Sequence, residues 1–456
     1  MYRKQYDELL NWKNRSNRKP LIIRGARQVG KTFLVREFAR EEFEHYIELN
    51  FDESPSKKEL FTHNDINTII QYLSLDSGIP VIPGKTLIFL DEIQRAPEVF
   101  AKLRYFFEKR NDVHLIAAGS LLDFVLANHT FSMPVGRIEY MYMGPMDFME
   151  YLLASDAGML HDFIRNYQIS DTIPELVHQK LLEHVRIYMS VGGMPSALRE
   201  YTGSKSIRQC EMELSSILNT YRDDFSKYQR KVDPYRLQLI LDKAPGLIGR
   251  KIKYTEISRE ERSSDLKTAM SMLELARVLY QVHHSSGNAI PLRVEKKERD
   301  FKLLFLDTGL VMRSLGLNLL DIRNKQLMTA NRGALAEQFA GQQWFNGQES
   351  NTPPELYYWN RENPRTSSEV DYLFQIDGKI IPVEIKAGTT GSLKSLHVFA
   401  SEKRSDTALR YNLDKPAVSD VTSRIPGKNI HTFKLISLPL YMISETRRLV
   451  RSMMNQ

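Results

Sequence analysis

Eight residues near the start of the chain form its clearest chemical pattern. The pattern is G-x-x-x-x-G-K-T, and it comprises Gly25, Ala26, Arg27, Gln28, Val29, Gly30, Lys31 and Thr32. Its glycines let backbone N–H groups surround phosphate oxygens. In such a loop the lysine reaches the β- and γ-phosphates, and the threonine hydroxyl ligates Mg²⁺. The pattern predicts ATP and Mg²⁺ as cofactors, with all eight residues at the nucleotide and Thr32 at the metal.

A pair of carboxylates forms the second chemical signal. Asp91 and Glu92 follow the apolar run at residues 87–90. A continuous apolar run is typical of a strand buried on both faces of a parallel sheet, and ligands bind at the carboxyl ends of such strands. We expect Asp91 to hold Mg²⁺ and Glu92 to orient or activate the attacking water.

Ser120 follows a third apolar run, at residues 113–118. Its position predicts a hydroxyl between neighbouring strand ends, where it touches the γ-phosphate or the water. Ser120 can also cap the helix predicted to begin at Leu121. The two roles are compatible, and the sequence leaves both open.

Another set of chemical residues lies near the C-terminus. Asp371 and Glu384-x-Lys386, with 12 residues between Asp371 and Glu384, fit the PD-(D/E)xK nuclease pattern, although Val370 replaces its proline. Strand alternation places Glu384 and Lys386 on one face. A hairpin turn at residues 377–378 brings Asp371 beside them, and Glu337 from a preceding helix completes the cluster.

These residue types suit metal-dependent phosphodiester cleavage. Asp371, Glu384 and Glu337 offer oxygen ligands to Mg²⁺, which activates water, and Lys386 positions that water or neutralises charge. The alternative is a nuclease-like fold that only binds, with its carboxylates in ordinary ion pairs. The spacing alone does not separate the two.

The elements that position the first site are short apolar strands. Residues 21–24 are predicted to form the strand before the phosphate loop, and residues 33–39 the helix after it. Residues 86–90, 113–118 and 138–142 are the other expected strands. Residues 150–245 show mainly helical periodicity.

Residues 235–310 follow a different pattern. Helices are expected at residues 235–243 and 264–278, followed by strands at 279–283 and 301–306. The connecting segment is basic and contains Arg293, Lys296, Lys297 and Arg299. This is a winged-helix pattern, in which basic residues can contact DNA phosphates without reading sequence. The alternatives are a solvated face that packs on neighbouring elements, or a protein-binding surface.

Composition sets limits on these hypotheses. The chain has 456 residues and a formal charge of +7, distributed as about −3 over residues 1–200, about +7 over 201–330 and about +3 over 331–456. Cys210 is the only cysteine, which excludes an internal disulfide and a cysteine-based zinc cluster. No apolar run approaches the length of a membrane span, and the N-terminus does not look like a secretory signal. We expect a cytoplasmic protein without membrane contact.

Taken together, the motifs resemble the AAA+ ATPases, and most closely a prokaryotic family that pairs the ATPase with a C-terminal domain of unknown function. The resemblance covers nearly the whole chain. It rests on residues 25–32, 90–94, 118–120, 136–137, 144–151, 191–195 and 221–224. Family members usually have leucine where Met143 or Gly144 falls.

The resemblance implies two further roles. Arg137, before the fifth strand, resembles an arginine finger that acts on the nucleotide of a neighbouring subunit, so the protein would be a homo-oligomer; the alternative is a structural salt bridge. Residues 193–195 resemble the Gly-x-Pro element of signalling-type relatives, where Pro195 would pack on adenine. Without that resemblance the segment is a turn between helices.

The predicted fold is α/β and multidomain. We expect an AAA+ parallel sheet at residues 1–144, a helical lid at 145–205, a winged helix at 206–318 and an α/β restriction-endonuclease-like domain at 319–456. The expected function is ATP binding and hydrolysis that drives action on DNA. The alternative is a nucleotide-controlled binding switch whose C-terminal domain cuts nothing.

Overall fold

The computed structural model divides the chain into two compact units. It describes residues 1–120, 122, 134, 136–228, 231–319, 332–361, 368–386, 393–425 and 430–454. Unit 1 comprises residues 1–145, 275–278 and 348–354, and unit 2 comprises the remaining described residues. Within the described ranges, no helix has the length and apolar character that a membrane span requires.

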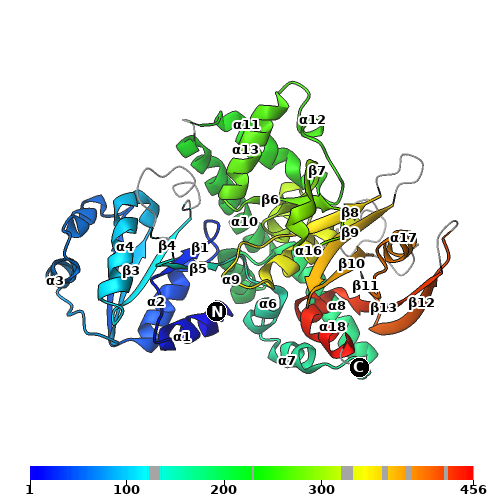
Figure 1. Cartoon of the computed structure of the whole chain (residues 1–456), viewed down its shortest axis with the longest axis horizontal. Coiled ribbons are helices and arrows are strands. Elements are labelled where there is room, and N and C mark those ends of the chain that lie inside the picture. The colour runs from blue at the N-terminus through cyan, green and yellow to red at the C-terminus, as the bar shows by residue number, and fades with distance from the viewer. Residues whose placement is uncertain are drawn as a thin grey trace. The chain divides into compact units, whose positions relative to one another are not determined.

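A five-stranded sheet organises unit 1 (Figure 1). Its spatial order is β2-β3-β4-β1-β5, and every neighbouring pair is parallel. The strands are β1 (Leu21–Arg24), β2 (His45–Asn50), β3 (Thr86–Asp91), β4 (His114–Gly119) and β5 (Glu139–Tyr142). The four predicted strands are confirmed to within one residue, and β2, which had not been predicted, forms an edge. Every residue of β3 and β4 is buried, as continuous apolar runs in a parallel sheet require.

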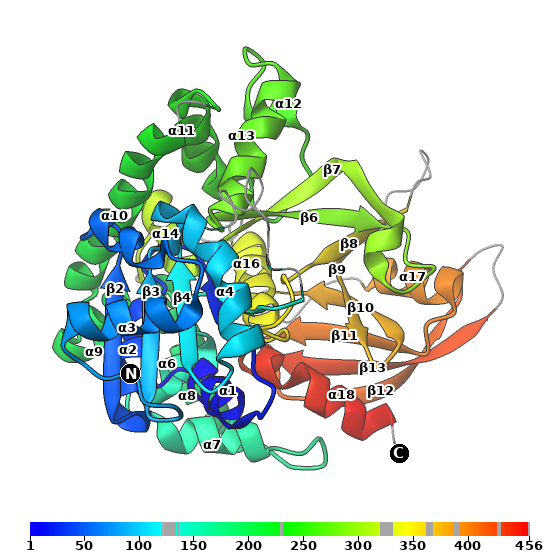
Figure 2. The same ribbon diagram turned by 60° about the vertical axis from the view of Figure 1, so that its left-hand side comes forward.

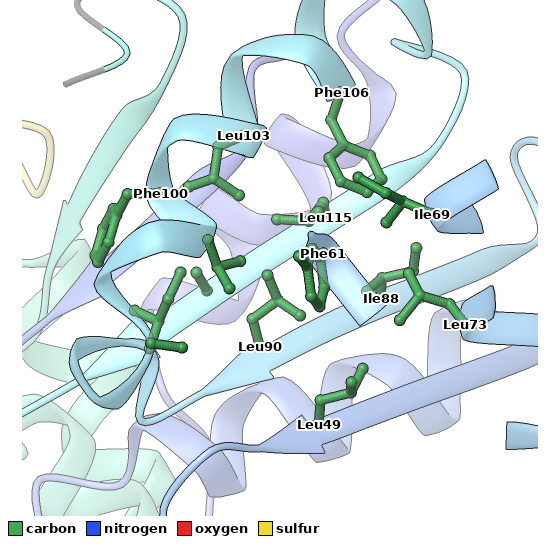
Figure 3. Packing of buried hydrophobic residues seen from close by; sticks show 14 of the residues in the cluster. Leu49, Phe61, Ile69, Leu73, Ile88, Leu90, Phe100, Leu103, Phe106 and Leu115 are labelled. Carbon is green, nitrogen blue, oxygen red and sulfur yellow. The ribbon is translucent and has the colours of Figure 1, made fainter. Parts of the chain in front are cut away.

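Helices cover this sheet. They are α1 (Gln5–Asn14), α2 (Lys31–Glu42), α3 (Ile66–Ser77) and α4 (Pro97–Lys109), with 3-10 turns η1 (Pro55–Phe61) and η2 (Ile93–Arg95). Figure 3 shows the main core, where Phe100, Leu103 and Phe106 of α4 pack over Leu90 and Leu115 of the central strands. All five side chains are buried. This packing fixes β3 and β4, and therefore the positions of the polar residues that end them.

Unit 2 begins with a helical region. Its helices are α6 (Phe148–Ala154), α7 (Gly158–Asn166), α8 (Glu175–Val191), α9 (Pro195–Ser204), α10 (Ile207–Asp224), α11 (Pro234–Lys243), α12 (Tyr254–Ile257), α13 (Ser263–Leu275) and α14 (Thr308–Ser314). Short 3-10 turns follow α10 (η3, Phe225–Tyr228) and α11 (η4, Ala244–Leu247). The helical periodicity predicted for this region is confirmed. Several helices begin at a capping aspartate, as at Asp147 and Asp307.

An eight-stranded mixed sheet forms the rest of unit 2 (Figure 2). Its spatial order is β12-β13-β11-β10-β9-β8-β6-β7. The strands are β6 (Leu279–Ser285), β7 (Lys296–Phe305), β8 (Tyr357–Asn360), β9 (Glu369–Ile376), β10 (Lys379–Ile385), β11 (Thr407–Asn412), β12 (Ala417–Ser423) and β13 (His431–Pro439). The accompanying helices and turns are η5 (Leu292–Glu295), α16 (Arg332–Asn346), α17 (Lys394–Lys403), η6 (Leu440–Glu445) and α18 (Thr446–Met454).

The structure corrects the expectation for the basic segment before Phe301. This segment had been predicted as a loop between two free strands, but Lys296 and Lys297 are already in β7, paired with Ser285 and His284 across a bulge. The ribbon also continues into a larger sheet, because β6 pairs in parallel with β8. Sheet pairing has therefore recruited residues whose polarity suggested a loop. The boundaries of the four domains proposed from the sequence stay predictions.

Candidate nucleotide site and carboxylate cluster

The phosphate loop has a backbone that glycine makes possible. Gly30 has φ 94° and precedes the first residue of α2, which is the left-handed region that side chains rarely adopt. At Gly25 a Cβ atom would lie 2.2 Å from the carbonyl oxygen of Met143. The two glycines therefore let the loop turn into α2 and lie close to the chain after β5. This arrangement of loop N–H groups and the N-terminus of α2 is suited to an anion, and the phosphate-binding role of the loop stays a prediction.

Lys31 lies folded into this loop. Its Nζ donates hydrogen bonds to the carbonyl oxygens of Gly25, at 3.1 Å, and Ala26, at 2.8 Å. Burial lowers the pKa of Lys31 to about 8, although Glu92 and Asp91 oppose that shift. A buried ammonium held by loop carbonyls is ready to exchange them for phosphate oxygens, which are stronger acceptors for a charged donor.

The structure brings Thr32 and Asp91 together. Thr32 Oγ1 donates to Asp91 Oδ2 at 2.9 Å, although the two residues are 59 positions apart. The backbone N–H of Glu92 donates to Asp91 Oδ1 at 3.0 Å. Asp91 is buried, and burial raises its pKa while the bond from Thr32 opposes the rise. A hydroxyl and a carboxylate in contact beside a phosphate loop are suitable oxygen ligands for Mg²⁺.

Glu92 has an unusual backbone conformation at the end of β3. Its φ is 50° and its ψ is 41°, in the left-handed region, which occurs often at functional sites. Gln94 Nε2 donates to Glu92 Oε2 and so holds the carboxylate in place. Gly119 makes room for this amide, because a Cβ there would lie 2.0 Å from Gln94 Oε1. Gln94 belonged to the family resemblance, but the sequence had assigned it no role.

Ser120 directly follows β4, which lies between β3 and β1. Its side chain is buried, and its Oγ has no hydrogen-bond partner among the described residues. A buried hydroxyl without a partner is costly unless a ligand or water satisfies it. The structure therefore places Ser120 where the sequence expected it. Of residues 121–125, where the helix that Ser120 was expected to cap begins, all but Leu122 lie outside the described residues.

The C-terminal chemical residues also come together. The turn at Asp377 and Gly378, with φ of 45° and 76°, joins β9 to β10 as predicted. Asp371 Oδ2 accepts a hydrogen bond from the backbone N–H of Ile385 at 2.7 Å, and Lys386 Nζ donates to Glu384 Oε1. The predicted hairpin and the shared face of Glu384 and Lys386 are confirmed.

A β-bulge helps to aim this cluster. Tyr357 pairs with Leu373, whereas Trp359 pairs with Val370, so β9 has one extra residue against β8. Such a bulge redirects side chains. Asp371 and Tyr372, adjacent in sequence, consequently both interact with groups around Glu337. Tyr372 Oη donates to the backbone oxygen of Glu337 at 2.9 Å.

Lys302 lies at the centre of the cluster. Its Nζ is 2.8 Å from Glu337 Oε1, 2.7 Å from Glu369 Oε1 and 3.6 Å from Asp371 Oδ1. The side chain of Lys302 is only 2% exposed. Burial alone lowers its pKa, but the three carboxylates outweigh burial and raise the pKa well above the usual value. Sequence reasoning had missed both Lys302 and Glu369.

The remaining carboxylate, Glu384, is also perturbed. Burial and the nearby charge of Asp371 raise its pKa to about 7, against the hydrogen bond from Lys386. Its Oε2 is buried without a hydrogen-bond partner among the described residues. Within those same residues, no group of three or more histidine, cysteine, aspartate or glutamate side chains is arranged to hold a metal ion.

Comparison with protein-family models covers three segments of the chain. Residues 17–152 match a family described as "AAA domain". Together with the parallel five-stranded sheet and the phosphate loop, this match decides the class of the N-terminal segment. Residues 17–152 form an AAA domain, which belongs to the P-loop NTPases.

The descriptions of the other two matching families name no activity. Residues 182–321 match a domain of unknown function (DUF8612), and residues 332–441 match another (DUF4143). The resemblance to an AAA protein with a C-terminal domain of unknown function is thus confirmed. Neither description mentions a nuclease or a winged helix, and both assignments stay predictions. No curated protein sequence matches the chain.

Solved structures show distant likeness. The Walker-type ATPase PABY2304 of Pyrococcus abyssi has 15% identity and a TM-score of 0.44, and the match covers 69% of this chain and 95% of that one. The ORC2 protein of Aeropyrum pernix has 12% identity and a TM-score of 0.36, with 71% and 96% covered. The RuvB Holliday junction branch migration motor of Thermotoga maritima has 14% identity and a TM-score of 0.28, with 62% and 90% covered.

Two arginines of unit 1, Arg137 and Arg277, make contacts that the structure defines. Arg137 Nε donates to Glu108 Oε1 at 2.8 Å, while its side chain is 42% exposed. This is the salt bridge that the sequence left open as an alternative, and the role of Arg137 in a neighbouring subunit stays a prediction. Arg277 lies over the ring of Tyr142, 4.5 Å from its centre, and its charge contributes to the lowered pKa of Lys31. No pattern in the sequence indicated Arg277.

Pro195 is the first residue of α9 in unit 2. The preceding turn is tightly held, because the backbone N–H of Gly193 donates to Asp307 Oδ2 at 2.6 Å and its carbonyl oxygen accepts from the N–H of Met146 at 2.7 Å. The structure thus gives the Gly-x-Pro segment a packing role inside unit 2. Its predicted contact with adenine stays a prediction.

Proposed function

We propose that the protein binds ATP with Mg²⁺ and hydrolyses it in the AAA domain. The observation that carries the proposal is the 2.9 Å contact between Thr32 Oγ1 and Asp91 Oδ2. It joins the phosphate loop to the acidic end of β3, and these are the two parts that P-loop NTPases use to hold the metal. Lys31 and the α2 N-terminus supply the positive charge that a triphosphate needs.

Each residue of the site has a defined task in this proposal. Lys31 exchanges its two loop carbonyls for phosphate oxygens. Glu92, held by Gln94, orients the attacking water, and Ser120 offers its buried hydroxyl to the γ-phosphate or to that water. Thr32 and Asp91 would hold Mg²⁺, which would supply positive charge against the negative charge that develops during hydrolysis. Arg137 would add a guanidinium from a neighbouring copy.

ATP turnover by variants tests the proposal. Lys31→Ala should weaken ATP binding, and Glu92→Gln should retain binding but lose hydrolysis, since positioned proton acceptors contribute about 10²–10⁴-fold. Lys85→Ala is the matched control, because Lys85 is exposed and pairs with Glu44 on the surface. Wild-type hydrolysis in both site variants would reject the assignment.

DNA contact is a second candidate function. Arg293, Lys296 and Lys297 are exposed around the start of β7, and such groups can neutralise phosphates. Glu298 offsets part of this charge, because it lies 3.0 Å from Lys267 and 3.9 Å from Lys296. We propose a modest, sequence-independent contact.

DNA affinity as a function of salt concentration tests this contact. Arg293→Ala with Lys297→Ala should lower both the affinity and the salt dependence, whereas Lys379→Ala, at an exposed position of β10, should leave both unchanged. DNA binding that is independent of salt, or unaffected by the double substitution, would favour packing or protein contact.

For the C-terminal domain we propose the switch alternative over cleavage. Cleavage would need Glu337, Asp371 and Glu384 around Mg²⁺ with Lys386 at the water, whereas the first two carboxylates lie around Lys302. In this proposal nucleotide state controls partner binding, and the domain cuts nothing. The test is Mg²⁺- or Mn²⁺-dependent cleavage of branched, single-stranded and duplex DNA. Cleavage that Asp371→Ala abolishes would restore the nuclease assignment.

A further inference from the structure

The carboxylate cluster of unit 2 already contains a cation. The Lys302 ammonium lies within 3.6 Å of oxygens from Glu337 of α16 and from Glu369 and Asp371 of β9. An ammonium that is nearly unexposed must be paired by carboxylates, since burying it alone is very costly. Three carboxylates converging on one point are, in turn, tolerable only around a positive charge.

Lys302 is held firmly in this position. It lies in the middle of β7, opposite Val282 of β6, so its backbone is fixed by the strand pair. The face of Tyr358 lies on its other side, with the ring centre 5.5 Å from Nζ. Lys386 differs, because its side chain is 29% exposed and pairs with Glu384.

An ammonium and a metal ion cannot share these ligands. Mg²⁺ and Mn²⁺ take carboxylate oxygens at about 2.1 Å, whereas Lys302 Nζ lies 2.7–2.8 Å from Glu369 and Glu337. A divalent ion bound to the same oxygens would approach the ammonium closely, and the two charges would repel. Asp371 also has a second partner, because its other oxygen accepts a hydrogen bond from the backbone N–H of Ile385.

We propose that Lys302 is the built-in cation of this cluster and fills the place that a divalent metal would take. The native C-terminal domain then binds no Mg²⁺ or Mn²⁺ there. Replacing Lys302 by an uncharged side chain leaves Glu337, Glu369 and Asp371 without their cation and creates a divalent metal site. This inference concerns unit 2 alone and is independent of ATP hydrolysis.

Mn²⁺ binding to the full chain without nucleotide tests the proposal. The free Mn²⁺ signal in electron paramagnetic resonance gives the number of bound ions for the wild type, Lys302→Met, Lys302→Met with Asp371→Asn, and Lys386→Met. We expect one additional ion in Lys302→Met and none in the other three. Lys386→Met is the matched control, since it removes a lysine from the same cluster without removing the central charge.

Thermal unfolding provides a second measurement. Lys302→Met should lower the Tm by about 5 °C or more, because it leaves buried carboxylates unpaired. Mn²⁺ should recover a large part of this loss in Lys302→Met and none of it after the added Asp371→Asn. The Tm of the wild type should not respond to Mn²⁺.

Two results would overturn the proposal. One is a Mn²⁺ ion in the wild type that Asp371→Asn removes. The other is a folded Lys302→Met protein that gains no ion. If Lys302→Met does not fold, Lys302→Gln keeps one donor for Glu337 and should gain the same ion; if neither folds, the comparison of wild type with Asp371→Asn decides.

Discussion

Asp307 should be among the most sensitive positions of unit 2, since one buried carboxylate satisfies three donors. Its Oδ2 accepts from Gly193 N at 2.6 Å and Gln342 Nε2 at 3.0 Å, and its Oδ1 from Leu310 N at 3.2 Å. Asp307→Ala leaves all three donors without this partner. A buried unsatisfied donor costs about 1–3 kcal/mol. With partial relaxation, the free energy of unfolding should fall by about 4 kcal/mol.

Asp233 provides the matched control for this substitution. It caps α11 as Asp307 caps α14, but it is exposed, and among the described residues its side chain accepts one hydrogen bond, from Tyr235 N at 3.0 Å. Loss of an exposed cap costs about 1 kcal/mol. Urea unfolding followed by tryptophan fluorescence measures both variants. Equal losses of stability in the two variants would refute the argument that burial and multiple bonds set the cost.

Two further predictions concern unit 1. His114 is buried between Trp12 and Phe43, and burial followed by the charge of Arg18 lowers its pKa to about 4. Because the folded state requires neutral imidazole, stability should be full above about pH 6.5 and fall by about 3 kcal/mol as the pH approaches 4. An NMR titration in which the His114 ring protonates at pH 6 or above would contradict this prediction. Gly25→Ala should destabilise unit 1 and abolish nucleotide binding, whereas Gly158→Ala, which meets no neighbouring atom, should fold normally; equal thermal stability in the two would count against the steric argument.

The candidate nucleotide site was largely predictable because the residues that define it are local in sequence. The phosphate loop needs glycine at fixed positions, and the acidic pair must follow an apolar strand. Both patterns can be recognised in the sequence without knowledge of tertiary contacts. The contact between Thr32 and Asp91 then follows from the parallel sheet, since the carboxyl ends of β1 and β3 lie at the same edge, with β4 between the two strands.

The carboxylate cluster was predictable only in part. Glu384 and Lys386 follow from strand alternation, and Asp371 follows from the hairpin. Lys302 could not be found in this way, because it falls in the predicted strand at residues 301–306, far in sequence from the carboxylates, and no motif gave it a role. Only the pairing of β7 with β6, and of β6 with β8, places that residue inside the sheet rather than at a surface. Arg277 was missed for the same reason, since its short segment joins unit 1 from a distant part of the chain.

Tertiary pairing that the sequence does not reveal also explains why Lys296 and Lys297 were predicted to lie in a loop although they lie in β7. Lys296 and Lys297 are poor strand residues by composition, and the intervening charges suggested a loop. Backbone pairing with β6 outweighs that preference, with a bulge absorbing the mismatch at His283 and His284. Local polarity therefore predicted the exposure of these lysines correctly and their backbone conformation wrongly.

The most direct test of the central claim is the single-turnover rate of ATP hydrolysis by Glu92→Gln, measured against wild type and Lys85→Ala. The arrangement of Glu92 at the end of β3, beside Asp91 and held by Gln94, predicts a rate at least about 100-fold below that of wild type, with ATP still bound. Lys85→Ala should match wild type. A Glu92→Gln protein that hydrolyses bound ATP at the wild-type rate would contradict the assignment of this site.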